Sequence, residues 1–513
     1  MTPNNNLGPE FVARLANGGF AETMSEDQRA AIHIRTQLDG FLEECLDAGK
    51  QVVLTGNPGD GKTQYILMQQ RRHDAPDDAY YLPDASAESD YEIVLNEWQT
   101  ALENERPGIL AINEGPLYEM LTRHQSEYEF LDTVADQLDT QIVLNEATTP
   151  QFDDNRLVVL NLNHRNVLSR PIALQAIQKL TTEVDIDPDE DDGHMGMNVA
   201  KLQNDTVQEN FKRIFRMLGK LDTHVTIRDL LNFLAYCLTG GRTESELDPD
   251  EDLKYYNLAY SGRGTLFELF RQYVDPEDLT HPFVDSILWS KAEREVSPRD
   301  VDEARSEIRS RYVQLKRRFL FEDDGMDLGY SSKSLYYDVD YDFLQLRNDD
   351  SGTQEDLENL LRRINGYFSN SRKMTYELQL WFSQKYIGRS TKAILSRHSV
   401  SKSDFEIRRP QLNPSIEDAM EYIPDSAVLE YTAGKTPVRL EITRSLYDSF
   451  SQIDSGIPYV LRDREEEQVL LEFMRDVEYQ ETPGESTGVV TIKDAETGNT
   501  EEVHVQDDRY EVE

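Results

Sequence analysis

The sequence predicts an α/β fold that starts with a parallel sheet and continues into a helical region and a C-terminal α/β region. Two observations support this prediction. Over residues 51–180 short apolar runs alternate with amphipathic helical patterns, and strands joined by helical crossovers lie parallel in one sheet. Beyond Pro171 the pattern is helical as far as residue 321, and the alternation typical of strands returns after it.

The elements of the first part follow one another closely. A helix over residues 25–48 ends at Gly49, and a β-rich run over residues 51–55 follows it. A glycine-rich turn then leads into a helix over residues 64–72. The remaining short apolar runs are predicted strands, at residues 80–82, 109–112 and 157–162, and the helical patterns between them include residues 93–102 and 117–124.

The later elements are mainly helical at first. The acidic run 183–192 separates two of the helices and is interpreted as a solvated loop, because it lacks the glycine and the glutamate of a calcium-binding loop. Predicted helices cover residues 173–180, 207–221, 227–238, 302–321 and 465–476, predicted strands cover 374–382 and 438–442, and a terminal hairpin pairs 489–493 with 502–506.

These patterns divide the 513 residues into regions, since the chain is too long for one compact domain. We expect an N-terminal helical segment (1–50), a core built on the parallel sheet (51–180), a helical lid-like region (181–300), a basic mixed α/β region (301–410) and a C-terminal α/β region ending in a hairpin (411–513).

The composition indicates a folded protein with a very negative surface. Hydrophobic residues make up 38%, but 97 Asp and Glu stand against 53 Lys and Arg, giving a net charge of −44. Such a surface repels nucleic acid and anionic lipid over most of its area. With 16 Lys against 37 Arg, the balance resembles the cytoplasmic proteins of salt-accumulating halophiles, so we interpret the charge as salt adaptation.

Two cysteines cannot form a disulfide framework, which favours a reducing compartment. The first residues lack the basic and apolar segments of a signal peptide, and no apolar stretch approaches the roughly 20 residues that span a bilayer. We therefore expect a cytoplasmic protein without a membrane partner.

The net charge predicts a fold that depends on salt. A charge of −44 repels itself, and the screening length shortens from about 30 Å at 0.01 M salt to about 3 Å at 1 M. The melting midpoint is therefore expected to rise between low and molar KCl, which thermal melting curves would measure. A midpoint that stays constant would argue against salt adaptation.

One motif carries specific chemistry. The run Gly56-Asn57-Pro58-Gly59-Asp60-Gly61-Lys62-Thr63 satisfies G-x-x-x-x-G-K-[ST] and lies between a predicted strand and a predicted helix. Its glycines let backbone N–H groups surround a phosphate at the positive end of the helix. The motif therefore predicts a P-loop NTPase that binds ATP and Mg²⁺, with Lys62 on the β- and γ-phosphates and the Thr63 hydroxyl on Mg²⁺.

A second strand ends in polar residues, as a Walker B strand does. The apolar residues 109–112 are followed by Asn113, in the usual aspartate position, and by Glu114. Asn113 can contact a metal-bound water but brings no charge, so we expect Thr63 and phosphate to hold most of the Mg²⁺. Glu114 is the candidate general base for the attacking water.

The strand at residues 157–162 precedes a candidate sensor of the γ-phosphate. Asn161 and Asn163 share one face of that strand; both remain open, and Asn163 is preferred. Arg165 is a candidate sensor or a finger that acts on a neighbouring subunit, with a surface salt bridge as the alternative. Arg228, at the start of a predicted helix, either reaches phosphate or caps that helix. Asp84 lies just after the predicted strand at residues 80–82.

Several stretches of the sequence together carry a resemblance to a known family. They are the P-loop and residues 111–115, 160–165, 226–231, 255–258, 361–368 and 438–447. These stretches resemble the ATPase component of the DNA phosphorothioation-dependent restriction machinery, a phage-defence system, and an AAA-like P-loop NTPase of the additional-strand class. The resemblance implies an ATPase that works with partner subunits such as a helicase or nuclease to restrict DNA without the host's sulfur modification. A homo-oligomer is a further possible assembly.

A local reversal of charge agrees with DNA as a partner. Residues 361–409 contain eleven basic residues against three acidic ones, a charge of +8, with aromatic residues such as Tyr367, Phe368 and Trp381 among them. Such rings stack on bases, although they are also typical of a core. The basic helix over residues 305–318 is a possible extension of this surface.

Two other functions are compatible with the motifs. Asn113 favours a nucleotide-controlled switch or scaffold that turns over little ATP and assembles partner proteins. A small-molecule kinase is disfavoured by Glu114 and by the large C-terminal region.

Overall fold

The chain folds into two compact units. The first comprises residues Met1–Tyr337 and Leu412–Ile423, and the second comprises Asp338–Gln411 and Pro424–Glu513. The computed structural model describes residues 7–18, 24–88, 90–144, 156–186, 193–221, 223–243, 246, 253–277, 281–296, 301–322, 343, 346, 354–368, 377–385, 392–454, 464–480, 489–494, 500–506 and 509–512. Within those ranges, no helix combines the length and the apolar character needed to cross a bilayer.

A four-stranded parallel sheet organises one part of the first unit, which confirms a mixed α/β fold with parallel strands. The strand order is β2-β3-β1-β5. Because β1 pairs directly with β3 and with β5, the carboxyl ends of these three strands meet at one edge of the sheet, where α/β proteins place their ligands. The strands are β1 (Gln51–Thr55), β2 (Tyr80–Leu82), β3 (Gly108–Ala111) and β5 (Leu157–Asn161).

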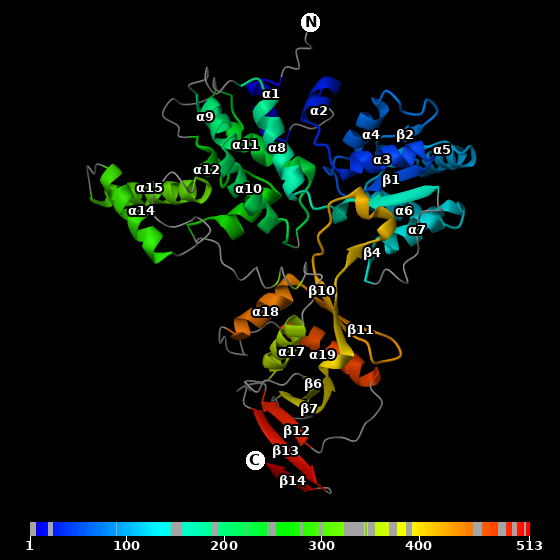
Figure 1. The fold of residues 1–513 in the computed structure, drawn as a ribbon, viewed down its shortest axis with the longest axis vertical. Coiled ribbons are helices and arrows are strands. Elements are labelled where there is room, and N and C mark those ends of the chain that lie inside the picture. Colours follow the sequence, from blue (N-terminus) through cyan, green and yellow to red (C-terminus); the bar gives the residue numbers. More distant parts are fainter. Residues whose placement is uncertain are drawn as a thin grey trace. The chain divides into compact units, whose positions relative to one another are not determined.

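Helices cover both faces of this sheet, as Figure 1 shows. Alternation along β1 directs Val52 and Leu54 into one apolar cluster with α3 and α4, and directs Val53 into another with α5, α6 and α7. Both clusters are buried, as expected for a parallel sheet. The helices are α3 (Gln37–Asp47), α4 (Lys62–Gln70), α5 (Tyr91–Glu103), α6 (Glu114–His124) and α7 (Phe130–Asp139).

The outer edge of β5 is paired with side chains. Gln137 in α7 donates to the Leu157 carbonyl and accepts from the Val159 amide, each at 2.8 Å. Gln141 accepts from the Asn161 amide at 2.9 Å. The two buried glutamines thus satisfy backbone groups that an edge strand leaves open. They also fix the end of β5 that carries Asn161.

The predicted helix over residues 25–48 is wrong as one element, because the chain breaks between α2 (Glu26–Ile32) and α3. His33 has extended backbone angles, and the Thr36 amide donates to the Asp39 carboxylate at 2.8 Å. Thr36 and Asp39 form a capping box that starts a new helix. The apolar spacing continues across the break, which is why the sequence pattern predicts a single helix.

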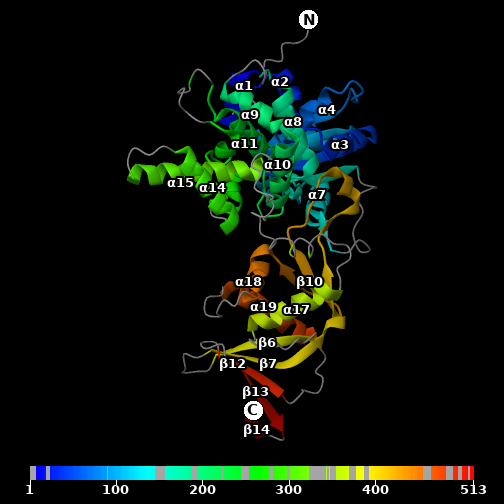
Figure 2. The same cartoon turned by 60° about the vertical axis from the view of Figure 1, so that its left-hand side comes forward.

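The remaining helices of the first unit pack around one apolar core with α1 and α2, and we call this part the helical region (Figure 2). The helix predicted at residues 227–238 is confirmed, and Gly240 ends it with φ 64°. Besides α1 (Pro9–Ala16), the helices are α8 (Arg170–Thr182), α9 (His194–Leu202), α10 (Asp205–Leu218), α11 (Ile227–Thr239), α12 (Tyr255–Leu258), α13 (Thr265–Leu269), α14 (Pro282–Glu295) and α15 (Val301–Phe321).

The second unit has its own core and antiparallel sheets, ordered β11-β10-β8 and β14-β13-β12-β7-β6. The predicted strand at residues 438–442 and the predicted terminal hairpin are confirmed, with Val489 opposite His504. The helices are α17 (Gln354–Phe368), α18 (Arg444–Asp454) and α19 (Arg464–Gln480), and the strands are β6 (Glu377–Lys385), β7 (Lys392–Ser401), β8 (Phe405–Arg408), β10 (Ala427–Tyr431), β11 (Val438–Ile442), β12 (Val489–Asp494), β13 (Thr500–Gln506) and β14 (Arg509–Val512).

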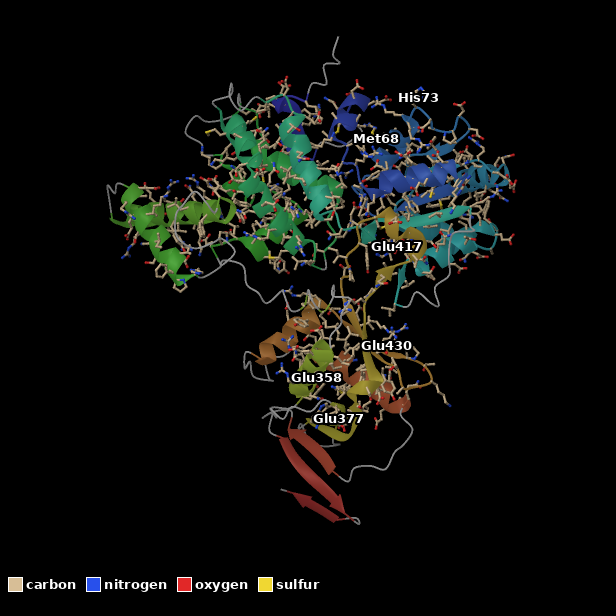
Figure 3. The ribbon with its side chains drawn as sticks, in the orientation of Figure 1. Met68, His73, Glu358, Glu377, Glu417 and Glu430 are labelled. Carbon is tan, nitrogen blue, oxygen red and sulfur yellow. The ribbon has the colours of Figure 1, made fainter. Side chains whose placement is uncertain are left out.

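The segment Leu412–Ile423 returns to the first unit between two parts of the second. It follows β9 (Gln411–Leu412) and contains the short helix η10 (Pro414–Ala419), on which Figure 3 labels Glu417. Leu412, Ile416 and Met420 belong to the same cluster as Leu54 of β1. The face of the sheet toward α3 is therefore completed by residues made late in the chain.

Candidate functional site

The loop after β1 has the shape of an anion cradle. We call Gly56–Thr63 the glycine loop. Gly56, Gly59 and Gly61 adopt φ values of 131°, 110° and 86°, which side chains beyond glycine rarely allow. Gly61 precedes α4, and no side chain caps this helix. The first-turn N–H groups of α4 and its positive dipole end therefore remain available to an anion.

Lys62 folds back into the glycine loop. Its Nζ donates to the Gly56 carbonyl at 3.0 Å and to the Asn57 carbonyl at 2.8 Å, and the residue is only 7% exposed. Burial lowers the pKa of Lys62 to about 8, against the opposing charges of Asp60 and Asp84. The ammonium group is thus held against two backbone carbonyls of the glycine loop.

The lowered pKa of Lys62 predicts a pH dependence of ATP affinity. In the free protein Lys62 loses its proton as pH rises through about 8, so binding of phosphate above that pH must first restore the proton. Affinity is expected to fall by up to about tenfold per pH unit above pH 8, and to stay level below it for this group. Calorimetric titration between pH 7 and 10 would measure this slope. Residual binding by Lys62→Arg should lack the slope, because a guanidinium stays charged.

Within the glycine loop, Asp60 is fully buried. Its Oδ2 accepts the Asn57 N–H at 2.7 Å, and its Oδ1 lies 2.7 Å from Nε2 of His224. The sequence placed Asp60 only among the phosphate-binding residues. Its partner His224 was missed, because 164 residues separate the two and no local pattern connects them.

Arg165 supports the glycine loop from below. The side chain donates to the Tyr65 hydroxyl at 2.9 Å and to the Asp60 carbonyl at 2.5 Å, and the residue is 2% exposed. A guanidinium buried against its own α4 cannot serve as a finger on a neighbouring subunit. The predicted role as a finger is therefore wrong, and a surface salt bridge is excluded because the side chain is buried.

The structure brings Glu114 together with both candidate sensors. Nδ2 of Asn163 donates to Glu114 Oε2 at 2.8 Å, and Nδ2 of Asn161 donates to Oε1 at 3.3 Å. Oδ1 of Asn163 accepts the Asn57 N–H at 2.9 Å. Glu114 follows β3, Asn161 ends β5 and Asn163 follows it, so these side chains meet across the end of β1. Asn163 is the one that joins the glycine loop to the carboxylate.

The predicted metal residues Thr63 and Asn113 both form hydrogen bonds with residues that follow β2. The Thr63 hydroxyl donates to the Pro83 carbonyl at 3.0 Å, and the backbone N–H of Asn113 donates to Ser86 Oγ at 2.7 Å. Asp84, exposed beside Thr63's partner, accepts the Ser86 N–H at 3.0 Å. The lone pairs of the Thr63 oxygen stay open to a cation, which fits a Mg²⁺ site at this residue. In the described part of the chain, no three or more His, Cys, Asp or Glu side chains are grouped to hold a metal.

The start of α11 also reaches the glycine loop. The Arg228 N–H donates to the Gly59 carbonyl at 3.2 Å. Capping of α11 is performed by Thr226 and Asp229, which form a capping box, so Arg228 does not have that role. Its charge lies close enough to Lys62 to lower the pKa of that lysine, although less than burial does.

The predicted DNA-contacting surface loses its stacking residues. Tyr367, Phe368 and Trp381 are at most 1% exposed and belong to the core of the second unit, so they cannot stack on bases. Lys402 pairs with Glu358. Arg408 pairs with Glu406 and Glu430, and Arg409 donates to the Leu346 carbonyl. Tyr376, Tyr386, Arg372, Lys373 and Arg389 lie outside the described residues, as do the side chains of Phe382, Lys385, Lys392 and Arg397.

The basic helix α15 is similarly neutralised. Five of its cations have acidic partners within the first unit, so this helix does not extend a basic surface. The pairs are Arg309–Glu277, Arg311–Glu295, Lys316–Asp285, Arg317–Asp275 and Arg318–Glu322.

Comparison with known proteins adds no relative: the chain matches no protein-family model, no curated protein and no solved structure.

Proposed function

We propose that this protein binds ATP with Mg²⁺ at the glycine loop and hydrolyses it. The geometry around the end of β1 carries the proposal. The buried Lys62 lies inside a loop of positive-φ glycines at the uncapped start of α4, and this arrangement supports phosphate binding. The Glu114 carboxylate contacts Asn163 across the end of β1, and this position supports activation of water.

Binding would rest on the chain's own groups around the phosphates. The first-turn N–H groups of α4 would donate to phosphate oxygens, and Lys62 would exchange its two carbonyl acceptors for the β- and γ-phosphates. Mg²⁺, when bound, neutralises phosphate charge, and the Thr63 oxygen would hold it. Asp84 would supply an exposed carboxylate next to Pro83, the acceptor of the Thr63 hydroxyl, since Asn113 has no charge.

Glu114 would position and deprotonate the attacking water. Its two oxygens accept hydrogen bonds from the side-chain amides of Asn161 and Asn163, which fix the carboxylate at the edge of the sheet. Oδ1 of Asn163 also accepts the Asn57 N–H, so a movement of the glycine loop would move the amide that binds Glu114.

The same geometry favours a second candidate, a nucleotide-controlled switch with little turnover. A carboxylate whose two oxygens already accept hydrogen bonds is less free to take a proton from water, and Asn113 supplies no charge to the metal.

The steady-state rate of phosphate release distinguishes the ATPase from the switch. Turnover of order 1 s⁻¹ or faster supports the ATPase, as typical enzymes reach such rates, whereas tight binding without turnover supports the switch. Transfer of phosphate to a small molecule instead of water would support a kinase.

We further propose that the ATPase acts within a DNA restriction complex, with partner subunits such as a helicase or nuclease. This step rests on the sequence resemblance alone. Stimulation of ATP hydrolysis by the assembled complex on unmodified DNA, and not on phosphorothioated DNA, would test it.

A further inference from the structure

The start of α11 is attached to the outer half of the glycine loop at two points. His224 Nε2 lies 2.7 Å from Asp60 Oδ1, and the Arg228 N–H donates to the Gly59 carbonyl at 3.2 Å. The fit is close, because a Cβ added to Gly59 would lie 3.0 Å from Thr226 Oγ1. The helical region and the phosphate cradle are therefore joined through Gly59 and Asp60.

Asp60 depends on these partners. Its carboxylate has no solvent exposure, and burial of a carboxylate without hydrogen-bond partners costs free energy. Oδ2 accepts the Asn57 N–H, and Oδ1 is in hydrogen-bond contact with the His224 imidazole. His224 with a proton on Nε2, neutral or charged, can donate to Oδ1.

Phosphate binding would make this contact more important. Lys62 now donates to the Gly56 and Asn57 carbonyls, and it must leave both to reach a phosphate. Asn57 is then held through its N–H, by Asp60 at 2.7 Å and by Asn163 at 2.9 Å. The shape of the loop with phosphate bound thus depends on where Asp60 is fixed.

We propose that His224 is a positioning residue for ATP binding. Its ring N–H fixes the Asp60 carboxylate, and Asp60 in turn holds the glycine loop in the conformation described above. The position of α11 thereby sets the affinity for ATP. The inference rests on the proposed binding of ATP at the glycine loop. It adds a means of regulation, because any partner or conformational change that moves the start of α11 would weaken ATP binding.

Two variants of similar size separate hydrogen bonding from packing. His224→Leu fills the site without a donor, and His224→Gln restores an N–H near the position of Nε2. His73→Leu is the matched control, because His73 is an exposed histidine beyond the end of α4 (Figure 3). Affinity for a non-hydrolysable ATP analogue with Mg²⁺ is measured by calorimetry, and melting temperature is measured without nucleotide.

His224→Leu is expected to weaken analogue binding by about tenfold or more, as loss of a hydrogen bond to a charged group does, while His224→Gln stays within about threefold of wild type. Asp60→Ala should weaken binding similarly, and His224→Leu should add nothing to it. If His224→Leu does not fold, the affinity of Asp60→Ala for the analogue tests the same contact, because this variant removes the acceptor instead of the donor. Nucleotide binding should also slow amide exchange at residues 223–229 in wild type and not in His224→Leu.

Full affinity of both His224→Leu and Asp60→Ala, with only a lower melting temperature, would overturn the inference and leave ATP binding intact. Equal losses in His224→Leu and His224→Gln would also overturn it, since the donor would then not matter. If wild type and His73→Leu bind no nucleotide, the proposed function fails and the inference fails with it.

Discussion

Lys62→Ala is expected to lose ATP binding while the protein stays folded. Lys62 brings the positive charge inside the glycine loop, and its two present acceptors, the Gly56 and Asn57 carbonyls, can be reached by water once the side chain is gone. Charge-assisted contacts to phosphate contribute about 1.5–3 kcal/mol each, so loss of two predicts a weakening of at least about 10²-fold. Calorimetric titration with ATP and Mg²⁺ measures it.

Lys179→Ala provides the matched control for this experiment. Lys179 lies on α8 of the same unit and pairs with Glu183 on the surface, so its loss should leave ATP affinity unchanged. Circular dichroism and the melting temperature show whether both variants are folded. Unchanged affinity in a folded Lys62→Ala would remove the basis for a phosphate site at this loop.

Glu114→Gln is expected to bind ATP normally and to lose hydrolysis. The amide keeps the size of the side chain but cannot accept a proton from water, and loss of a general base costs about 10² to 10⁴ in rate. A small change in binding follows from the contacts with Asn161 and Asn163, one of which would lose a charged acceptor. Single-turnover hydrolysis at saturating ATP measures the chemical step.

Asp84→Asn is the informative comparison, because Asp84 is an exposed carboxylate near the site, whereas Asp60 is buried. It is exposed beside the carbonyl that binds Thr63, so its loss should raise the Mg²⁺ concentration needed for binding rather than stop the chemical step. Wild-type turnover in Glu114→Gln, with turnover lost in Asp84→Asn, would show that the two roles were assigned the wrong way round.

Sequence patterns located the strands of the parallel sheet well, because each is a short apolar run next to a clear turn or helix. Their order in the sheet could not be predicted, since chain order does not determine which strands are neighbours. β3 pairs with both β1 and β2, so the strand that precedes Asp84 is not a direct neighbour of the strand that precedes the glycine loop.

The glycine loop could be recognised from sequence because its chemistry lies within eight consecutive residues. The contacts of Asp60 with His224 and of Arg165 with Tyr65 could not, since they join residues about 100 or more positions apart. The burial of aromatic side chains could not be predicted from the sequence either. Trp381 lies in a basic stretch, but its ring packs against Phe368 in the core of the second unit. A count of charged and aromatic residues does not show whether such a side chain points into the core or toward solvent.

The late return of Leu412–Ile423 to the first unit has a consequence for synthesis. Leu412, Ile416 and Met420 cover a face of the sheet whose last strand ends at Asn161, so about 250 further residues must be made before that face is closed. At roughly 5–20 residues per second, the ribosome needs on the order of 10 to 50 s for this interval. During that time the nascent first unit exposes apolar surface from β1 and β5, which makes it a client for chaperones. A fragment that stops before residue 412 would keep that surface open for good.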